Sequence, residues 1–209
     1  MRTCVEGWSR TVKKIVIATK NKGKIAEIKL ALKSISVNVL GLDEFDNVPD
    51  AIEDGNSFEE NAIIKAKFYA EHLKIACLAD DSGLEVYSLD NEPGIYSARY
   101  AGDKATDHDN NKLLLKKLNG ATENNRKACF RCVLAFADID GTVFTTEGVC
   151  EGAILTEERG SGGFGYDPLF WVAQYQKTMA EISAEDKNKI SHRGKAVLNM
   201  SNKLADYLK

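Results

Sequence analysis

The chain has 209 residues, of which 44% are hydrophobic, and its formal net charge is −3. A chain of this size can bury one sizeable core, as one large domain or one domain with a lobe. It lacks the overall basic excess of nucleic-acid-binding proteins, and it has no apolar run near the roughly 18 residues that a membrane span needs. We therefore expect neither nucleic acid nor a membrane as a partner.

The first segment with a clear structural pattern starts after a polar N-terminus. Residues 1–12 are too polar for a secretory signal and are expected to form a disordered leader, with one α/β domain at 13–209. The β-branched run at 13–18 predicts a buried strand, and after the loop 19–24 apolar residues at helical spacing predict a helix. A second strand is predicted at 37–42.

The middle of the chain alternates between helix and strand signals. Ser57 and Glu60 form a capping box ahead of a long helix, and Thr106 with Asp109 caps another helix that runs through Leu118. Between these helices, strands at 75–79 and 84–88 are predicted to flank an acidic turn, Asp80-Asp81-Ser82-Gly83.

The C-terminal half begins with a hairpin signal and ends with a helix. Asp140-Gly141 lies between strand-like runs at 128–138 and 142–150, which predicts a β-hairpin. A helix is predicted from about Ser191. With the strands and helices before it, this order indicates a mixed α/β fold.

Five cysteines are present, and two of them match a C-x-x-C pattern. Cys129 and Cys132 lie within a predicted strand, where positions three apart point to opposite faces and the sulfurs diverge. We interpret the cysteines as reduced core residues of a cytoplasmic protein rather than as a metal or disulfide site.

The acidic pair Asp80-Asp81 is a candidate for chemistry. Neighbouring carboxylates repel, so a cation or several donors must neutralise them. One interpretation is a Mg²⁺ site in which one carboxylate remains free to act as a base; the alternative is an ordinary acidic turn. Glu53 and Asp54 supply a second acidic cluster, which either contributes another metal ligand or is simply solvated.

The loop 19–24 contains three lysines and a threonine between a strand and a helix start. Backbone N–H groups and the helix dipole favour an anion there, which indicates a phosphate site. The loop does not match G-x-x-x-x-G-K-[ST], so the P-loop family is not implied. The alternative is a solvated, lysine-rich turn.

Two further segments could recognise a nucleotide base. The loop 160–165 formally matches G-x-G-x-x-G, but the Pro168 that follows disfavours the helix which that fingerprint requires. The loop is better interpreted as presenting Phe164 and Tyr166 as flat surfaces for a base, with Asp167 as a polar contact; the alternative is aromatic core residues beside a mobile loop. Near the last helix, Lys187, His192 and Arg193 offer donors to phosphate or a base carbonyl, or else lie on the surface, whereas His72 and His108 are expected to face solvent.

These pieces together resemble the inosine triphosphate pyrophosphatase family. The resemblance runs from about Lys14 to the last helix, and its six landmarks occur in the family's order. They are Thr19-Lys20-Asn21-Lys22-Gly23-Lys24, Ser57-Phe58-Glu59-Glu60-Asn61-Ala62, Ala79-Asp80-Asp81-Ser82-Gly83-Leu84, Pro93-Gly94-Ile95-Tyr96-Ser97-Ala98-Arg99-Tyr100, Gly162-Gly163-Phe164-Gly165-Tyr166-Asp167-Pro168 and Ser191-His192-Arg193-Gly194.

The resemblance implies roles for individual residues. Asp81, helped by Asp80, would be the base, and Asp81 with Glu53 would bind Mg²⁺. The substrate contacts would be Thr19, Lys20, Asn21, Lys22, Gly23 and Lys24 on the triphosphate, and Ser82, Phe164, Gly165, Tyr166, Asp167, Lys187, His192 and Arg193 on the nucleotide. The chain departs from the family in its first ten residues and at Ala173, where many relatives have proline.

The resemblance also implies the fold, the assembly and the reaction. The fold would be an elongated α/β structure, with a long, mixed, twisted sheet and two lobes flanking a central active-site cleft, in a cytoplasmic homodimer. The reaction would hydrolyse ITP, dITP or XTP to the nucleoside monophosphate and pyrophosphate. Alternatives are a related nucleotide pyrophosphatase with another base preference, and a nucleotide sensor without catalysis. How guanine would be excluded does not follow from the sequence.

Overall fold

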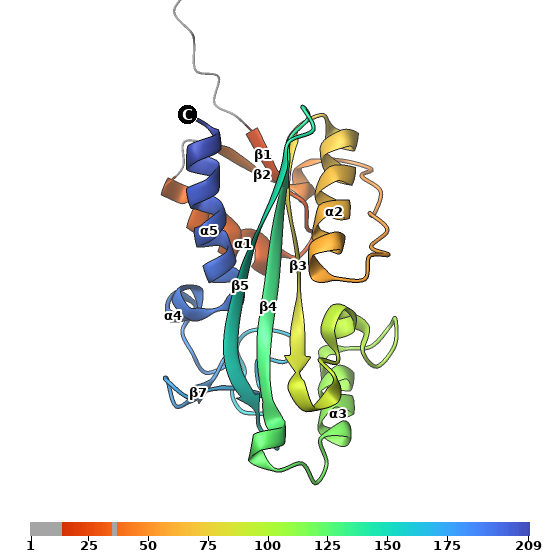
Figure 1. Cartoon of the computed structure of the whole chain (residues 1–209), viewed down its shortest axis with the longest axis vertical. Coiled ribbons are helices and arrows are strands. Elements are labelled where there is room, and N and C mark those ends of the chain that lie inside the picture. Colours follow the sequence, from red (N-terminus) through yellow and green to blue (C-terminus); the bar gives the residue numbers. More distant parts are fainter. Residues whose placement is uncertain (1–13, 35–36) are drawn as a thin grey trace, which may run out of the picture.

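A computed structural model describes residues 14–34 and 37–209, and it shows an elongated α/β fold around one sheet (Figure 1). The described strands have the order β2-β1-β3-β4-β5-β6-β7. Their bounds are β1 (Lys14–Ile17), β2 (Asn38–Gly41), β3 (Ala76–Val86), β4 (Lys127–Ala137), β5 (Val143–Ile154), β6 (Phe170–Val172) and β7 (Lys177–Thr178). Because β1 is parallel to both of its neighbours and the other pairs are antiparallel, the predicted mixed, twisted sheet is confirmed. The expected leader at 1–12 lies outside the described residues.

Helices cover both faces of the upper half of this sheet. In Figure 1, α1 and α5 lie on one side of the strands and α2 on the other. The α-helices are α1 (Lys22–Ala31), α2 (Phe58–Leu73), α3 (Asp107–Lys117), α4 (Ala184–Ile190) and α5 (His192–Tyr207), and the 3₁₀ helices are η1 (Leu32–Ser34), η2 (Leu42–Glu44), η3 (Tyr87–Leu89), η4 (Gly94–Arg99) and η5 (Glu123–Arg126). Ser57 and Thr106 cap α2 and α3 as predicted, each by accepting a bond from the backbone N–H three residues on.

Strand alternation divides the core between the two faces. Ala76 and Leu78 of β3 pack toward α1 and α5, whereas Cys77 and Ala79 pack toward α2. A third apolar cluster, around Leu114 of α3, fills the other end of the molecule. Full burial of a large aliphatic side chain contributes about 1.5–3 kcal/mol, so these three clusters hold the long sheet in place.

The predicted acidic turn is wrong, because β3 continues through it as one strand. Every residue from Asp80 to Gly83 is paired with β4. Gly83 does not make a turn: a Cβ there would lie 2.4 Å from both the carbonyl oxygen of Gly94 and Oγ of Ser97. Glycine therefore lets η4 pack against the strand, and strand alternation turns Asp80 and Asp81 to opposite faces.

The hairpin prediction is confirmed, and the hairpin is longer than expected. β4 and β5 pair continuously from Lys127↔Ala153 to Ala137↔Val143 around Asp140-Gly141. Cys77, Cys129, Cys132 and Cys150 are buried free thiols, as expected for core residues, and Cys4 lies outside the described residues. Within the described ranges, no helix has the length and apolar character to cross a membrane.

Candidate active site

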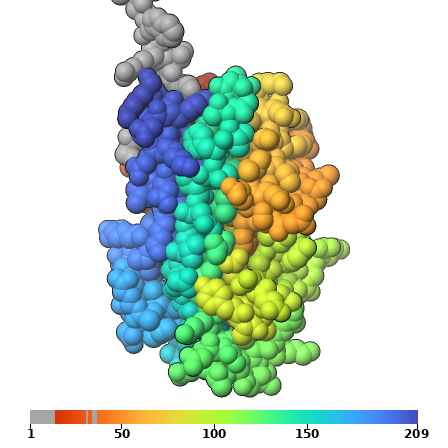
Figure 2. Space-filling model, in the orientation of Figure 1, coloured from red at the N-terminus to blue at the C-terminus, as the bar shows by residue number. Residues whose placement is uncertain are grey.

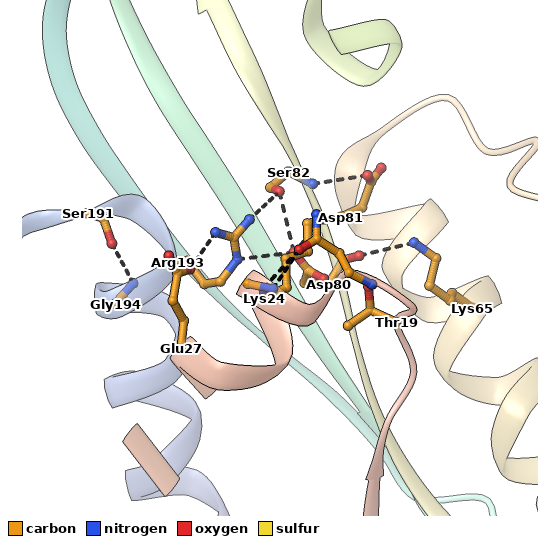
Figure 3. Close-up of polar contacts among 12 residues, drawn as sticks. Thr19, Lys24, Glu27, Lys65, Asp80, Asp81, Ser82, Ser191, Arg193 and Gly194 are labelled. Atoms are coloured by element: carbon orange, nitrogen blue, oxygen red, sulfur yellow. Dashed lines mark hydrogen bonds and ion pairs between the residues drawn. The ribbon is translucent and has the colours of Figure 1, made fainter. Parts of the chain in front are cut away.

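The site lies where β1 ends and leaves one edge of β3 open. β1 pairs with β3 only as far as Ile17↔Leu78. From Ala79 onward β3 has β4 on one edge, while within the described residues no strand pairs with its other edge, where an isolated bridge joins Glu85 to Pro93. Side chains from both faces of β3 therefore border one edge that is not paired with a strand, next to the loop that follows β1 (Figure 3).

That loop is shaped by short-range hydrogen bonds at the start of α1. Oδ1 of Asn21 accepts from the backbone N–H groups of Gly23 (2.9 Å) and Lys24 (3.1 Å), so Asn21 is the N-cap of α1. Thr19 Oγ1 accepts from the N–H of Asn21 at 3.2 Å. The capping bonds fix the direction in which Lys24 leaves the first turn.

The three lysines of the loop have different surroundings. Lys20 pairs with Asp50 at 2.6 Å on the surface, and Lys22 is exposed. Lys24 turns toward the strand, with its Nζ 3.0 Å from Oδ2 of Asp80. Lys24 is thus the lysine of this loop that contacts the acidic strand, and Figure 3 shows it beside Asp80.

Asp80 is a buried anion between two cations from different helices. Its side chain is 1% exposed, and Nε of Arg193 lies 3.3 Å from the same Oδ2 that Lys24 contacts. Burial alone would raise the pKa of Asp80, but Lys24 and Arg193 hold it well below its usual range. Asp80 therefore stays ionised and holds Lys24 and Arg193 at the strand edge.

Arg193 connects three segments through its guanidinium group. Besides Asp80, it donates from Nη2 to Ser82 Oγ (3.0 Å) and from Nη1 to Glu27 Oε2 of α1 (2.7 Å). Its side chain is 2% exposed. Removing one partner from such a buried charge network costs far more than any surface pair contributes.

Asp81 lies on the opposite face of β3, with weaker neutralisation. Its Oδ2 accepts from Nδ2 of Asn61 (3.1 Å), and its Oδ1 accepts from the N–H of Ser82 (3.0 Å). Burial raises the pKa of Asp81 to about 6; nearby Glu53 adds to the rise, while Lys65 and Asn61 oppose it. A carboxyl group with this pKa can accept a proton near neutral pH.

Glu53 and Lys65 complete the α2 side of the site. Lys65 Nζ lies 2.7 Å from Oε2 of Glu53 and donates to the carbonyl oxygen of Asp80 at 3.1 Å. Lys65, Asn61 and Glu27 were missed by the sequence analysis. A signal existed for two of them, because Asn61 and Lys65 are one turn apart, each directly before a small apolar residue of the α2 core stripe.

The expected base-binding residues group around Phe164. The Phe164 side chain is 39% exposed, and its ring centroid lies 5.1 Å from Lys187 Nζ and 5.8 Å from Arg193 Cζ. Lys187 also pairs with Asp167, Nζ to Oδ2 at 2.5 Å. Gly165 follows Phe164 and donates its N–H to Asp107 of α3.

Tyr166 and His192 are placed differently from the sequence-based expectation. Tyr166 is 4% exposed, since its ring joins the core around Leu114 and its hydroxyl donates to the carbonyl oxygen of Ser97, so it presents no open surface for a base. His192 stacks on Phe130, and burial, with Arg193 and Lys187 nearby, lowers the pKa of its imidazole well below the usual value. His192 is thus a neutral, buried ring.

The other two histidines, His72 and His108, are exposed as expected.

A groove of about 1070 Å³ lies on the face of the molecule shown in Figure 2. It opens where α2, η4 and β5 meet, and its wall includes Phe58, Tyr96 and Val133. Val133 is the β4 partner of Asp81, so the groove reaches the neighbourhood of that carboxylate. It is not lined by Lys24 or Arg193, and a central cleft that spans both ends of the substrate stays a prediction.

Known proteins match this chain along most of its length. The chain is 51% identical over 183 residues to a protein of Desulfotalea psychrophila named dITP/XTP pyrophosphatase, covering 88% of this chain and 81% of that one. A HAM1 protein from Coxiella burnetii superposes with a TM-score of 0.86 at 42% identity, covering 93% of this chain and 100% of that one. The Ham1 protein of Staphylococcus aureus gives a TM-score of 0.85 at 42% identity, with the same coverage.

The family suggested by the sequence and the fold of the structure therefore agree. The sequence model of the Ham1 family matches residues 15–203, which include most of β1, the open edge of β3 and the Arg193 network. This chain belongs to the Ham1 family.

Proposed function

We propose that this protein hydrolyses purine nucleoside triphosphates with non-standard bases (ITP, dITP and XTP) to the monophosphate and pyrophosphate. The observation that carries the proposal is that two neighbouring aspartates at the edge of β3 have different electrostatic surroundings. Asp80 holds two cations there, while its neighbour Asp81 has a pKa of about 6. Relatives named dITP/XTP pyrophosphatase support the choice of substrate.

The protein's own groups account for a direct attack by water. Asp81 orients a water molecule and takes its proton as the oxygen bonds to the α-phosphorus. The bond from the α-phosphorus to the bridging oxygen breaks, and pyrophosphate leaves with the bonding electrons. Lys24, with its neighbours in the loop 19–24, stabilises the charge on the leaving group.

The acidic residues fit a Mg²⁺ ion that is shared with the substrate. Asp81 is a buried carboxyl group whose pKa is raised further by Glu53, so a cation between these two groups would relieve their repulsion. Among the described residues no three acidic, histidine or cysteine side chains are close enough to hold a metal by themselves. Mg²⁺ is commonly bound by one or two carboxylates plus substrate phosphates, so Asp81 and Glu53 would be its protein ligands. When bound, it would neutralise phosphate charge and lower the pKa of a coordinated water.

Base selection is proposed to depend on Phe164, Lys187 and Arg193. The ring is half-exposed and offers a stacking surface, and the two cations near it are donors to a 6-keto oxygen. Adenine carries an amino group at that position, which is a donor and cannot accept from these two cations. Sites that require a hydrogen bond reject analogues lacking it by roughly 10⁴-fold or more.

Two further proposals concern the setting of the protein. The family resemblance supports a homodimer, which light scattering can measure. The four buried free thiols support a reducing, cytoplasmic compartment.

A pyrophosphate-release assay across ITP, XTP, GTP and ATP, with and without Mg²⁺, tests the proposal. We expect release from ITP and XTP, far less from GTP and ATP, and loss of release in EDTA. A preference for a standard or pyrimidine nucleotide would indicate the related pyrophosphatase, and binding of ITP without release would indicate a sensor. Asp81→Asn should abolish release while ITP binding largely remains.

A further inference from the structure

Two residues of helix α3 form hydrogen bonds with one residue of the glycine-rich loop, Gly165. Asp107 is the first residue of α3, and Asn111 lies one turn later on the same helix face. Oδ2 of Asp107 accepts from the N–H of Gly165 at 2.7 Å, and Nδ2 of Asn111 donates to the carbonyl oxygen of Gly165 at 3.3 Å. Both backbone polar groups of Gly165 are thus bound by α3.

We propose that Asp107 and Asn111 are positioning residues for the base end of the substrate. By holding Gly165, they keep Phe164 in place over Lys187 and Arg193. The inference rests on the proposed function, in which the purine stacks near Phe164, and it adds a role for α3, which belongs to the lower end of the molecule (Figure 1).

The bonds to α3 add to local bonds of the loop, in which the carbonyl oxygen of Phe164 accepts from the N–H of Asp167 at 3.3 Å. On the N-terminal side, the backbone N–H of Phe164 donates to Asp167 Oδ2 at 3.0 Å. Gly165 has φ +62°, a left-handed conformation that glycine adopts without strain. Without the bonds to α3, the N–H and the carbonyl oxygen of Gly165 would lose their partners on that helix, and the position of the aromatic ring against the two cations would be less well fixed.

The burial of Asn111 argues that its contacts do more than fill space. Asn111 is 3% exposed, and Nδ2 also donates to Glu158 Oε1 at 2.9 Å. Its Oδ1 has no hydrogen-bond partner within the described structure. A buried amide is costly when half of it is unpaired, so an apolar residue would serve packing better. The amide donor directed at Gly165 and Glu158 offsets that cost and fixes the loop.

Amide hydrogen exchange tests the two bonds that join Asp107 and Asn111 to Gly165, here called the clasp, without reference to any substrate. Asp107 is exposed, so Asp107→Ala should fold, and the N–H groups of the loop 160–165 should exchange roughly tenfold faster. Asp107→Asn keeps an acceptor oxygen and should leave exchange close to wild type. Asp103→Ala, an exposed acidic residue at the same end of the molecule, is the matched control. Unchanged exchange in Asp107→Ala would overturn the clasp.

Steady-state kinetics then test its role in binding the base. Asp107→Ala should raise KM for ITP roughly tenfold and change kcat by less than about twofold, with Asp107→Asn restoring most of the loss. Inhibition by inorganic tripolyphosphate, which lacks a base, should be unchanged. Faster loop exchange with an unaltered KM, or an equal loss of tripolyphosphate binding, would refute positioning of the base. Absence of pyrophosphate release from ITP by the wild type would instead refute the proposed function, and the clasp would still be measured by exchange.

Discussion

Replacing Asp81 by asparagine is expected to make the protein more stable while it removes catalysis. Burial raises the pKa of the Asp81 carboxyl group from its ordinary value of 3.8 to about 6 in the folded protein. The folded state therefore binds this proton more tightly than the unfolded chain. Below about pH 3.8 the carboxyl group is protonated in both states and does not lower the stability of the fold. The stability falls as pH rises from there, and the full loss is reached above about pH 6. A shift of about two pH units corresponds to about 3 kcal/mol of stability lost at pH 8.

Asparagine is neutral at every pH and keeps one oxygen, which can accept from Asn61 but not also from the N–H of Ser82. At pH 8 the free energy of unfolding of Asp81→Asn should exceed that of the wild type by up to about 3 kcal/mol. Each kcal/mol should raise Tm by about 2–4 °C. At pH 5 the gain should be roughly half as large, because part of the wild type is then protonated. Urea denaturation at both pH values in EDTA measures the gap, and the exposed Asp103→Asn serves as control. A difference in unfolding free energy that does not grow with pH would refute a raised pKa at Asp81, whereas a constant offset would reflect the lost acceptor for Ser82.

Three further outcomes follow from the same charges. For the free enzyme, kcat/KM for ITP should fall roughly tenfold per pH unit below about pH 6, as Asp81 protonates; a flat profile from pH 5 to 7 would exclude it as the base. Lys24→Ala should chiefly weaken substrate binding, and unchanged KM and kcat would show that the loop is not the phosphate site. Arg193→Leu should lower the free energy of unfolding by about 3–5 kcal/mol, because Asp80 and Glu27 each lose a buried partner. A free energy of unfolding, measured by urea denaturation, within about 1 kcal/mol of wild type would contradict this.

The fold could be predicted where local chemistry decides the structure. The β-branched run before Thr19 predicted β1. Asp140-Gly141 predicted the hairpin, because glycine readily adopts the positive φ (+92° at Gly141) that a tight turn needs. Ser57 and Thr106 located two helix starts, since their hydroxyl groups satisfy free backbone N–H groups. These signals need no knowledge of distant contacts.

The acidic turn could not be predicted correctly, because its conformation depends on a distant segment. Asp-Asp-Ser-Gly favours a turn locally, yet pairing with β4, about fifty residues later, keeps the segment extended. The partners of Arg193 were hidden for the same reason: Glu27 and Asp80 lie 166 and 113 positions away in the sequence. The family landmarks identified the residues, but only the folded chain shows which of them contact each other.

The open edge of β3 explains how two adjacent aspartates can have opposite electrostatic roles. On one face, Lys24 and Arg193 lower the pKa of Asp80, so that this carboxylate remains charged and holds the cations. On the other face, burial beside Glu53 raises the pKa of Asp81, so that this carboxyl group can exchange a proton near neutral pH. A turn would have brought the two groups together in one environment. A strand separates their surroundings while keeping both at the edge where β1 stops, which is why chemistry at this position requires an extended segment rather than a loop.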